Sequence, residues 1–421
     1  MTARTISEKI LSAKCGRDAR AGDIAVCTPD LVLGTDASAP MAIAYFEQMG
    51  GERLADASRV VFAFDHYSPP ASAATEAFHE RVRAFAARHS AELYEVGDGI
   101  SFQRVMELGR ALPGDLILGA DSHTVTCGAL NLFATGVGSS DLAAAMLTGK
   151  LWLRVPESIR VELTGDRAAG VSAKDVGLAM VAAIGAEGAN YAALEFHGPA
   201  LAALSLEERL VLSNLAVETG AKTAIFPADA ATHDYLRARA ARRGAPVSAD
   251  PGARYSRTVV LDLATLSPRV ALPHAPDHVV PLTEAVGTPV QMVFLGTCTG
   301  GRVSDLHDAL ATLERAGGRL APGVQLVVTP ASREVRERLV ADGTLGKLEA
   351  MGAIITTAGC GACCGTSGVI PGDGFNVIST ANRNFKARMG YATASIFLAS
   401  PAACAAAAAT GRITDPRAFP P

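Results

Sequence analysis

The sequence lacks several features that would place it in a class at once. No apolar run reaches the roughly 18–20 residues that a membrane-spanning helix needs. The net charge is only −4 and no block of like charges occurs, so there is no basic surface for nucleic acid or an anionic membrane. We therefore expect neither a nucleic-acid partner nor a membrane partner.

The N-terminus lacks the marks of a secretory leader. Residues 1–17 mix charges with apolar residues at helical spacing, without an apolar core or a small-residue cleavage site. The chain has no low-complexity linker, and 421 residues with 49% apolar content are enough for two or three packed domains. These features favour a cytoplasmic enzyme.

Cysteine is scarce, with eight residues unevenly spaced along the chain. This excludes the disulfide framework of short secreted domains. Cys15, Cys27, Cys127 and Cys404 are isolated and are typical of small buried residues. The glycine-flanked loop 359–365 holds three cysteines within five residues, which indicates metal or redox chemistry.

Apolar runs typical of strands alternate with runs typical of helices, which predicts an α/β fold with mostly parallel sheets. Five of the strand-like runs end in polar residues. They are 60–64, 116–120, 292–296, 354–357 and 377–380, leading into Asp65–His66, Asp121–His123, Thr297–Cys298, Gly359–Cys360 and Asn382–Arg383. Because ligands bind outside the carboxyl ends of parallel strands, the five ends predict one convergent site.

Prolines crowd together between residues 271 and 289, which indicates a domain boundary. We expect an N-terminal region, 1–283, that carries the aspartate and histidine strand ends. A C-terminal domain, 284–421, would carry the candidate cysteine ligands.

The pair Cys360 and Cys363 leaves several kinds of site open. A thioredoxin-like redox pair would place this spacing at a helix start, and a structural zinc site would need a second pair. An iron–sulfur cluster can take a third thiolate from a distant loop, and Cys298 at its own strand end offers one. Three ligands to a four-iron cluster would leave one iron open as a Lewis acid. A loop without metal is the remaining alternative.

The other polar strand ends combine carboxylates with imidazoles, as acid–base catalysis requires. Asp65–His66 and Asp121–His123 are such pairs, and Glu195 ends a further apolar stretch. Each pair could instead be satisfied locally at its strand end. His79 and His89 share an arginine-rich helix and are expected to be solvated.

The segment 382–388 holds two arginines five residues apart, Arg383 and Arg388. Guanidinium forks bind carboxylates with two parallel hydrogen bonds, so this segment suits a di- or tricarboxylate. A solvated basic turn is the alternative.

Taken together, the motifs Gly119–Thr124, Thr297–Thr299, Gly359–Gly365 and Asn382–Phe385 resemble the aconitase superfamily, and most closely its isopropylmalate dehydratase large subunits. The resemblance extends over essentially the whole chain. It implies aconitase-like three-layer α/β/α domains surrounding an iron–sulfur cluster. It also implies a hydro-lyase of leucine biosynthesis that interconverts 2- and 3-isopropylmalate, a small hydroxy-dicarboxylate, by dehydration and rehydration.

The resemblance also implies roles for individual residues. Cys298, Cys360 and Cys363 would hold a [4Fe–4S] cluster with one open iron, while Cys364 would not be a ligand. Asp65 and His66 would protonate the departing hydroxyl, and His123 would pair with Glu195 as a second acid–base couple. The remaining contacts to substrate and pocket would come from Asp121, Ser122, Asn382, Arg383 and Arg388.

Two residues depart from the superfamily pattern. Phe102 stands where a histidine would pair with Asp121, so Asp121 is expected in more apolar surroundings. Gly300 stands where asparagine is usual. These departures keep open a related enzyme for another hydroxy-dicarboxylate or -tricarboxylate, such as a homoaconitase-like or alkylmalate enzyme. A cluster-sensing regulatory protein is a further alternative, which the lack of a basic surface disfavours.

The superfamily's swivelling domain has no counterpart in the 421 residues. The resemblance therefore implies a separate small subunit that carries this domain and completes the active site.

Overall fold

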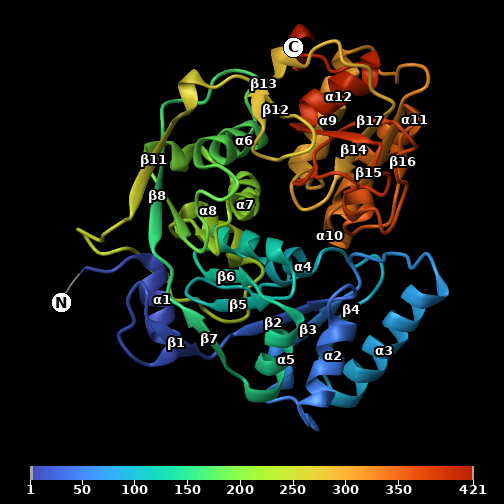
Figure 1. Cartoon of the computed structure of the whole chain (residues 1–421). Coiled ribbons are helices and arrows are strands. Elements are labelled where there is room, and N and C mark those ends of the chain that lie inside the picture. Colours follow the sequence, from blue (N-terminus) through green and yellow to red (C-terminus); the bar gives the residue numbers. More distant parts are fainter. Residues whose placement is uncertain (1–2, 420–421) are drawn as a thin grey trace.

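The computed structural model describes residues 3–419 and confirms the predicted α/β fold (Figure 1). Its strands form a five-stranded, a four-stranded, a seven-stranded and a two-stranded sheet. The strands are β1 Ile24–Cys27, β2 Leu31–Thr35, β3 Val60–Ala63, β4 Glu92–Tyr94, β5 Leu116–Gly119, β6 Phe133–Gly136, β7 Leu151–Arg154, β8 Ser158–Thr164, β9 Ala193–His197, β10 Thr223–Ile225, β11 Arg257–Asp262, β12 Arg269–Ala271, β13 Val279–Pro281, β14 Met292–Gly296, β15 Gln325–Thr329, β16 Ile354–Ile355, β17 Asn376–Ser379 and β18 Ser395–Ala399.

The helices mostly begin at a serine, threonine or aspartate cap. The hydroxyls of Ser72, Ser172 and Ser205, for example, accept backbone N–H groups at the starts of three helices. The α-helices are α1 Ile6–Cys15, α2 Ala39–Gln48, α3 Ala73–His89, α4 Ser101–Glu107, α5 Ser139–Thr148, α6 Ala173–Ile184, α7 Leu206–Leu215, α8 Ala230–Arg237, α9 Val303–Arg315, α10 Arg333–Ala341, α11 Thr344–Ala350 and α12 Pro401–Thr410.

The five-stranded sheet is parallel, with the order β4-β3-β2-β5-β6. Alternate side chains point to opposite faces. Val32 and Phe62 pack in one core with α2, α3 and α5, while Leu33 and Val61 join a second core with α4. This is a three-layer arrangement. The strand order reverses between β2 and β5, which is where an open α/β sheet forms its ligand crevice.

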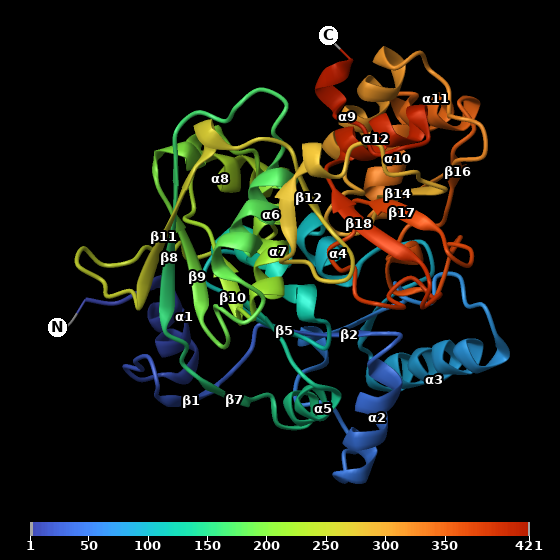
Figure 2. The ribbon, with the colours of Figure 1, turned by 45° about the horizontal axis from the view of Figure 1, so that its top comes forward.

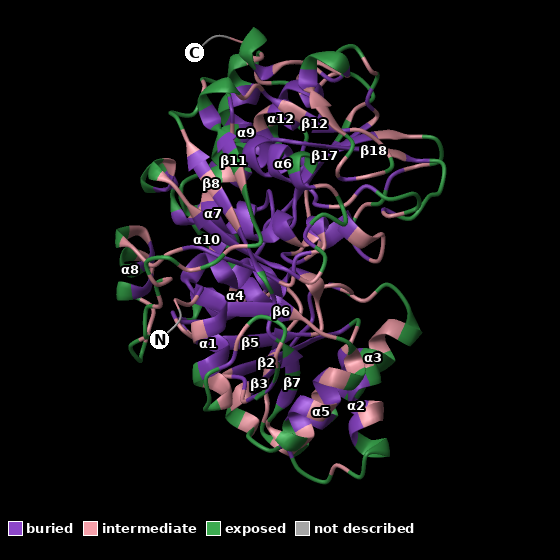
Figure 3. Cartoon of the chain, turned by 60° about the vertical axis from the view of Figure 1, so that its left-hand side comes forward, coloured by how far each residue is buried: buried purple, intermediate pink, exposed green. Residues whose placement is uncertain are grey.

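The parallel four-stranded sheet, β10-β9-β8-β11, adjoins this second core through α6 and α7. Figure 3 shows how continuous the buried interior is across these layers. Among the described residues, no helix combines the length and apolar character needed to span a bilayer.

The seven-stranded sheet has the order β13-β12-β18-β17-β14-β15-β16. Residues of α9–α12 cover one face of this sheet. The other face is covered by the loop that holds Cys363 and by Leu178, which belongs to α6. Because β12 and β13 belong to this sheet, it begins before the predicted boundary at residue 283. The proline-containing segment forms short antiparallel strands at the sheet edge, where proline is tolerated.

All five strands predicted to end in polar residues are present, as β3, β5, β14, β16 and β17. Two of them belong to the five-stranded sheet and three to the seven-stranded sheet. Figure 2 shows the C-terminal part, in orange and red, lying beside the blue loop that follows β3.

Candidate active site

The polar strand ends of the two large sheets meet in one place. The amide of Cys360 donates to the carbonyl of Asp65 at 2.8 Å, and the hydroxyl of Thr366 donates to the carbonyl of His66 at 2.8 Å. These bonds join the cysteine loop to the loop after β3. Contacts of Asp121 with His66, of Asn382 with Cys298 and of Arg383 with Ser122 bring in the other three strand ends, so the predicted convergence is present.

His66 lies between two carboxylates. Its Nδ1 is 2.6 Å from Oδ1 of Asp65, and its Nε2 is 3.5 Å from Oδ2 of Asp121. Burial disfavours the imidazolium, but the two carboxylates outweigh it and raise the pKa of His66 well above its ordinary value. Asp65 is fully buried, and its Oδ2 accepts the amide N–H of Ser101 at 2.8 Å. These contacts therefore favour the protonated form of the His66 imidazole.

A second imidazole–carboxylate couple lies beside the first. Nε2 of His123 is 2.9 Å from Oε1 of Glu218, which also accepts Nε of Arg383 at 2.9 Å. Burial opposes ionisation of Glu218, but these two partners lower the pKa of its carboxyl. Burial likewise opposes ionisation of Asp121, and hydrogen bonds from His123 together with the charge of His66 lower its pKa.

The predicted pairing of His123 with Glu195 is wrong. Glu195 lies in β9, and its carboxylate accepts the amides of Ile6 and Ser7 at 3.2 and 3.0 Å, at the first turn of α1. Hydroxyls from Ser7, Ser158 and Tyr255 complete its hydrogen bonds. Glu195 therefore joins the first turn of α1 to Ser158 of β8 and to Tyr255, and it has no hydrogen bond to His123 among the described residues. The local sequence around Glu195 does not reveal these partners.

Sequence reasoning missed Glu218 and Asn214. They lie four residues apart at the end of α7 and the turn that follows it, so they share one side of the chain. Both polar side chains are buried, and the intervening residues 215–217 are apolar. Two polar residues one turn apart in an otherwise apolar stretch were the available signal.

The site cysteines are free thiols, of which Cys298 and Cys363 are buried and Cys360 is half-buried. Sγ of Cys298 accepts Nδ2 of Asn214 at 3.0 Å and Nδ2 of Asn382 at 3.2 Å. Sγ of Cys363 lies 3.7 Å from Oδ1 of Asn382 and 3.8 Å from a guanidinium nitrogen of Arg388. One asparagine thus joins the loops of Cys298 and Cys363.

The donor set fits a metal–sulfur group. Burial raises the pKa of Cys298 to about 12 and raises those of Cys360 and Cys363, so these thiols would not ionise at neutral pH without a cation. Soft sulfur ligands together with N–H donors aimed at the sulfurs are typical of iron–sulfur sites.

The backbone of the cysteine loop approaches its neighbours closely. A side chain on Gly361, where φ is +56°, would lie 2.6 Å from the hydroxyl oxygen of Thr329. Thr297, directly before Cys298, also has a positive φ of 68°, a strained backbone conformation of the kind found at functional sites. The cysteine loop therefore requires glycine at position 361 to bring its cysteines into the site.

The predicted carboxylate-binding residues adjoin the acid–base groups. A terminal guanidinium nitrogen of Arg383 donates to the hydroxyl of Ser122 at 3.1 Å, and Asn382 and Arg388 contact the cysteines. A cavity of about 380 Å³ is lined by Asp121, Ser122 and Lys222 beside this cluster. It offers space for a small molecule next to the two couples.

The two departures from the superfamily pattern have physical explanations. Phe102 is fully buried in the core shared with Cys298. Asp121 nevertheless lies beside the imidazoles of His66 and His123, so the more apolar surroundings expected for it are not found. At Gly300, a Cβ atom would lie 2.1 Å from Cβ of Thr380, which leaves no room for asparagine.

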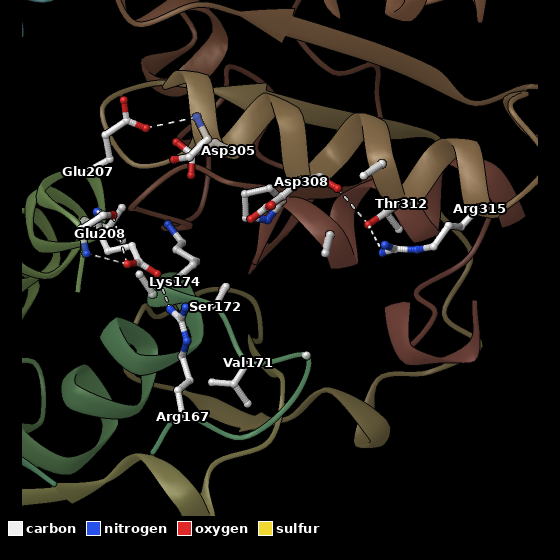
Figure 4. Close-up of a pocket in the computed structure, with 18 residues that line it drawn as sticks. Arg167, Val171, Ser172, Lys174, Glu207, Glu208, Asp305, Asp308, Thr312 and Arg315 are labelled. Atoms are coloured by element: carbon white, nitrogen blue, oxygen red, sulfur yellow. Dashed lines mark hydrogen bonds and ion pairs between the residues drawn. The ribbon is translucent and has the colours of Figure 1, made fainter. Parts of the chain in front are cut away.

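A separate cavity of about 440 Å³ opens between α6, α7 and α9 (Figure 4). Lys174 lines this cavity, and its ammonium donates to the carbonyls of Thr380 and Ala381 at 2.8 and 2.7 Å. It thereby holds the strand end that precedes Asn382. Sequence reasoning gave Lys174 no role.

Comparisons with known proteins agree with this architecture. Residues 8–411 match the aconitase family (aconitate hydratase). A "3-isopropylmalate dehydratase large subunit 1" of Methanopyrus kandleri is 45% identical over 99% of both chains. A "probable methanogen homoaconitase large subunit" of Methanosarcina mazei is 43% identical over 92% of this chain and 98% of its own.

A solved structure shares the fold at low sequence identity. The crystal structure of aconitase X from Thermococcus kodakaraensis, in its holo form, has a TM-score of 0.50 and 12% identity, covering 90% of this chain and 88% of its own. The family match spans nearly the whole chain, and the relatives match from end to end. The chain belongs to the aconitase family.

Proposed function

We propose that the chain is the large subunit of a 3-isopropylmalate dehydratase, a hydro-lyase that moves a hydroxyl between neighbouring carbons through an unsaturated diacid. The observation that carries the proposal is the placement of two imidazole–carboxylate couples beside the three thiols of Cys298, Cys360 and Cys363. Full-length relatives of the same name, at 45% and 41% identity, support it.

His66 is the acid that protonates the departing hydroxyl. Hydroxide is a poor leaving group at neutral pH, and a proton supplied in position removes this obstacle. The raised pKa keeps the imidazole protonated until it donates, and Asp65 fixes which nitrogen faces the substrate.

His123, Glu218 and Asp121 hold the second part of the acid–base chemistry. The lowered pKa of Glu218 keeps its carboxylate charged, so it orients the ring of His123 at Nε2. Arg383 and Ser122, which are joined by a hydrogen bond, are placed to bind a substrate carboxylate. A guanidinium there also stabilises negative charge that develops when a proton leaves the adjacent carbon.

Cys298, Cys360 and Cys363 would hold a [4Fe–4S] cluster in which one iron lacks a cysteine ligand. When bound, this group supplies a Lewis acid that polarises the substrate hydroxyl. Asn214, Asn382 and Arg388 would donate hydrogen bonds to its sulfur ligands. Cys364 contacts the hydroxyl of Thr366 at 2.8 Å and is not counted among the ligands.

The complete enzyme would contain a small subunit with a swivel domain. The matched relatives are themselves named large subunits, and this chain covers nearly their whole length. The partner would close over Arg383 and Ser122 and contribute the remaining catalytic groups.

The test is to purify the chain without oxygen together with its small subunit and to assay 2-isopropylmalate. We expect a brown protein that forms 3-isopropylmalate and loses its visible absorption in air. A colourless protein after anaerobic cluster reconstitution would contradict the cofactor assignment. An intact cluster without turnover would contradict the substrate.

A homoaconitase-like activity is the second candidate, supported by the relative from Methanosarcina mazei. The cavity lined by Asp121 and Lys222 offers a cation for a further carboxylate. Assaying a homologous tricarboxylate in parallel distinguishes the two, because the preferred substrate has the higher kcat/KM.

A further inference from the structure

A buried acid–imidazole pair lies behind the couple of Asp65 and His66. Asp36, directly after β2, and His79, on α3, are both 0% exposed. The expectation that His79 is solvated is wrong, because its side chain points from α3 into the sheet end rather than toward the arginines of the helix. His89, about three turns beyond His79, is half-buried at the C-terminal end of α3.

Asp36 holds the backbone of the catalytic loop. Its Oδ1 accepts the amide N–H of His66 at 3.0 Å, and its Oδ2 accepts the amide N–H of Tyr67 at 2.9 Å. Nε2 of His79 lies 3.1 Å from the same Oδ2. Both carboxylate oxygens are thus used, and two of the three donors belong to the segment that carries the catalytic imidazole.

The orientation of His79 is fixed as tightly as that of Asp36. Its ring stacks on Phe64 with centroids 3.9 Å apart and planes 2° apart. Its Nδ1 is buried and has no partner among the described residues, so Nε2 is the nitrogen that donates to Asp36. The ring is therefore held by its own helix, α3, and by Phe64, the residue that links β3 to Asp65 and His66.

We propose that Asp36 and His79 are a positioning pair for the proposed dehydration: His79 holds the carboxylate of Asp36, and Asp36 sets the backbone from which His66 projects. The inference rests on the proposed function, since it concerns the direction of a catalytic ring. Nδ1 of His66 also lies 3.8 Å from Oδ1 of Asp36, so a shift of this carboxylate changes the ring's surroundings directly.

The effect on the reaction follows from geometry. Protonation of a leaving hydroxyl needs Nε2 of His66 within hydrogen-bond reach, and a misplacement of about 1 Å can cost about 100-fold in rate. Among the described residues, neither Asp36 nor His79 forms a hydrogen bond or ion pair with Arg383 or Ser122, the residues placed to bind a carboxylate. Loss of the pair should lower kcat and leave KM nearly unchanged.

The experiment compares His79→Leu, His79→Gln and His89→Gln in the complete complex with cluster and small subunit. Glutamine at 79 restores an N–H donor close to the position of Nε2. His89→Gln is the matched control, because it removes an imidazole from the same helix. The ring of His89 contacts Phe46 and Phe85 rather than Asp36.

We expect His79→Leu to lower kcat about 10- to 100-fold with KM within about 2-fold and with unchanged iron content. His79→Gln should recover most of the lost kcat, and His89→Gln should match the wild type. Equal losses in His79→Leu and His79→Gln, or a rise in KM without a fall in kcat, would overturn the proposal.

Hydrogen exchange of residues 64–68 gives a second measurement that does not depend on the substrate. In His79→Leu the amides of His66 and Tyr67 should exchange faster, and in His89→Gln they should not. Unchanged exchange in His79→Leu overturns the positioning role even if the enzyme is active. If the wild type does not turn over the substrate but exchange is still faster in His79→Leu, the proposed function is contradicted and the positioning role is not.

Discussion

At the scale of the residue, two glutamates show what a linear pattern contains and what it omits. The sequence marks Glu195 and Glu218 alike as acids beside apolar segments. Only the packing separates them, because Glu195 faces the start of α1 and Glu218 faces His123. By contrast, Asp65 and His66 are adjacent in the chain, so their pairing could be predicted.

The two glutamates should respond differently to removal of charge. Glu218→Gln should lower kcat about 100-fold, because His123 and Arg383 lose their shared carboxylate. Glu195→Gln should leave kcat within about 2-fold but lower the free energy of unfolding by about 1–3 kcal/mol, because one amide oxygen cannot accept five donors. Steady-state kinetics and denaturant titration check both variants. The reverse pattern would restore the original assignment of Glu195.

The adjacent cysteines of the loop allow a similarly matched comparison. Cys363→Ser should abolish cluster binding and activity, while Cys364→Ser should retain most of both, since Cys364 contacts Thr366 rather than Asn382 or Arg388. Iron and sulfide content per chain, measured after anaerobic reconstitution, is the readout. Equal losses would mean that the ligand set has been chosen wrongly.

At the scale of the element, the five strand ends were predictable because buried parallel strands are short apolar runs that stop at a polar residue. The strands β12 and β13 were missed because they are three residues each and lie among prolines. Contacts between strand ends could not be predicted from either strand alone. The approach of Gly300, after β14, to Thr380, after β17, is such a contact.

This contact predicts a coupled pair of substitutions. Gly300→Ala alone should lower the free energy of unfolding by about 1–3 kcal/mol, because its methyl group overlaps Thr380. Combining it with Thr380→Gly should recover part of that loss, and a double-mutant cycle by denaturant unfolding measures the coupling. If the two substitutions change the free energy of unfolding additively, the close approach of Gly300 and Thr380 does not couple them.

At the scale of the whole molecule, the site exists only where separate sheets meet, and a buried lysine ties two of them together. Lys174 starts α6, beside the four-stranded sheet, and bonds the end of β17 in the seven-stranded sheet. Burial lowers its pKa to about 8, against an ordinary 10.5. No local pattern predicts this bond, because its partners are backbone carbonyls 206 and 207 residues away.

The lysine gives stability a pH dependence of known sign. Between pH 8 and 10.5 the unfolded chain binds a proton at Lys174 that the folded protein has released, so this residue's contribution to stability rises with pH across that window. Between pH 8 and 10.5 the free energy of unfolding of the wild type should rise by about 3 kcal/mol relative to that of Lys174→Met. Denaturant unfolding of both proteins at several pH values measures the difference. Parallel pH profiles would contradict it.

The bond from Thr366 to the carbonyl of His66 spans 300 residues, and it has a consequence for the order of events during synthesis. The N-terminal sheets can form while the chain is still on the ribosome, since domains generally fold as they emerge. The thiols and the arginine loop come last. A nascent chain therefore holds the imidazole–carboxylate couples before it has a metal-binding pocket. Iron delivery must follow translation of the C-terminal sheet rather than accompany it.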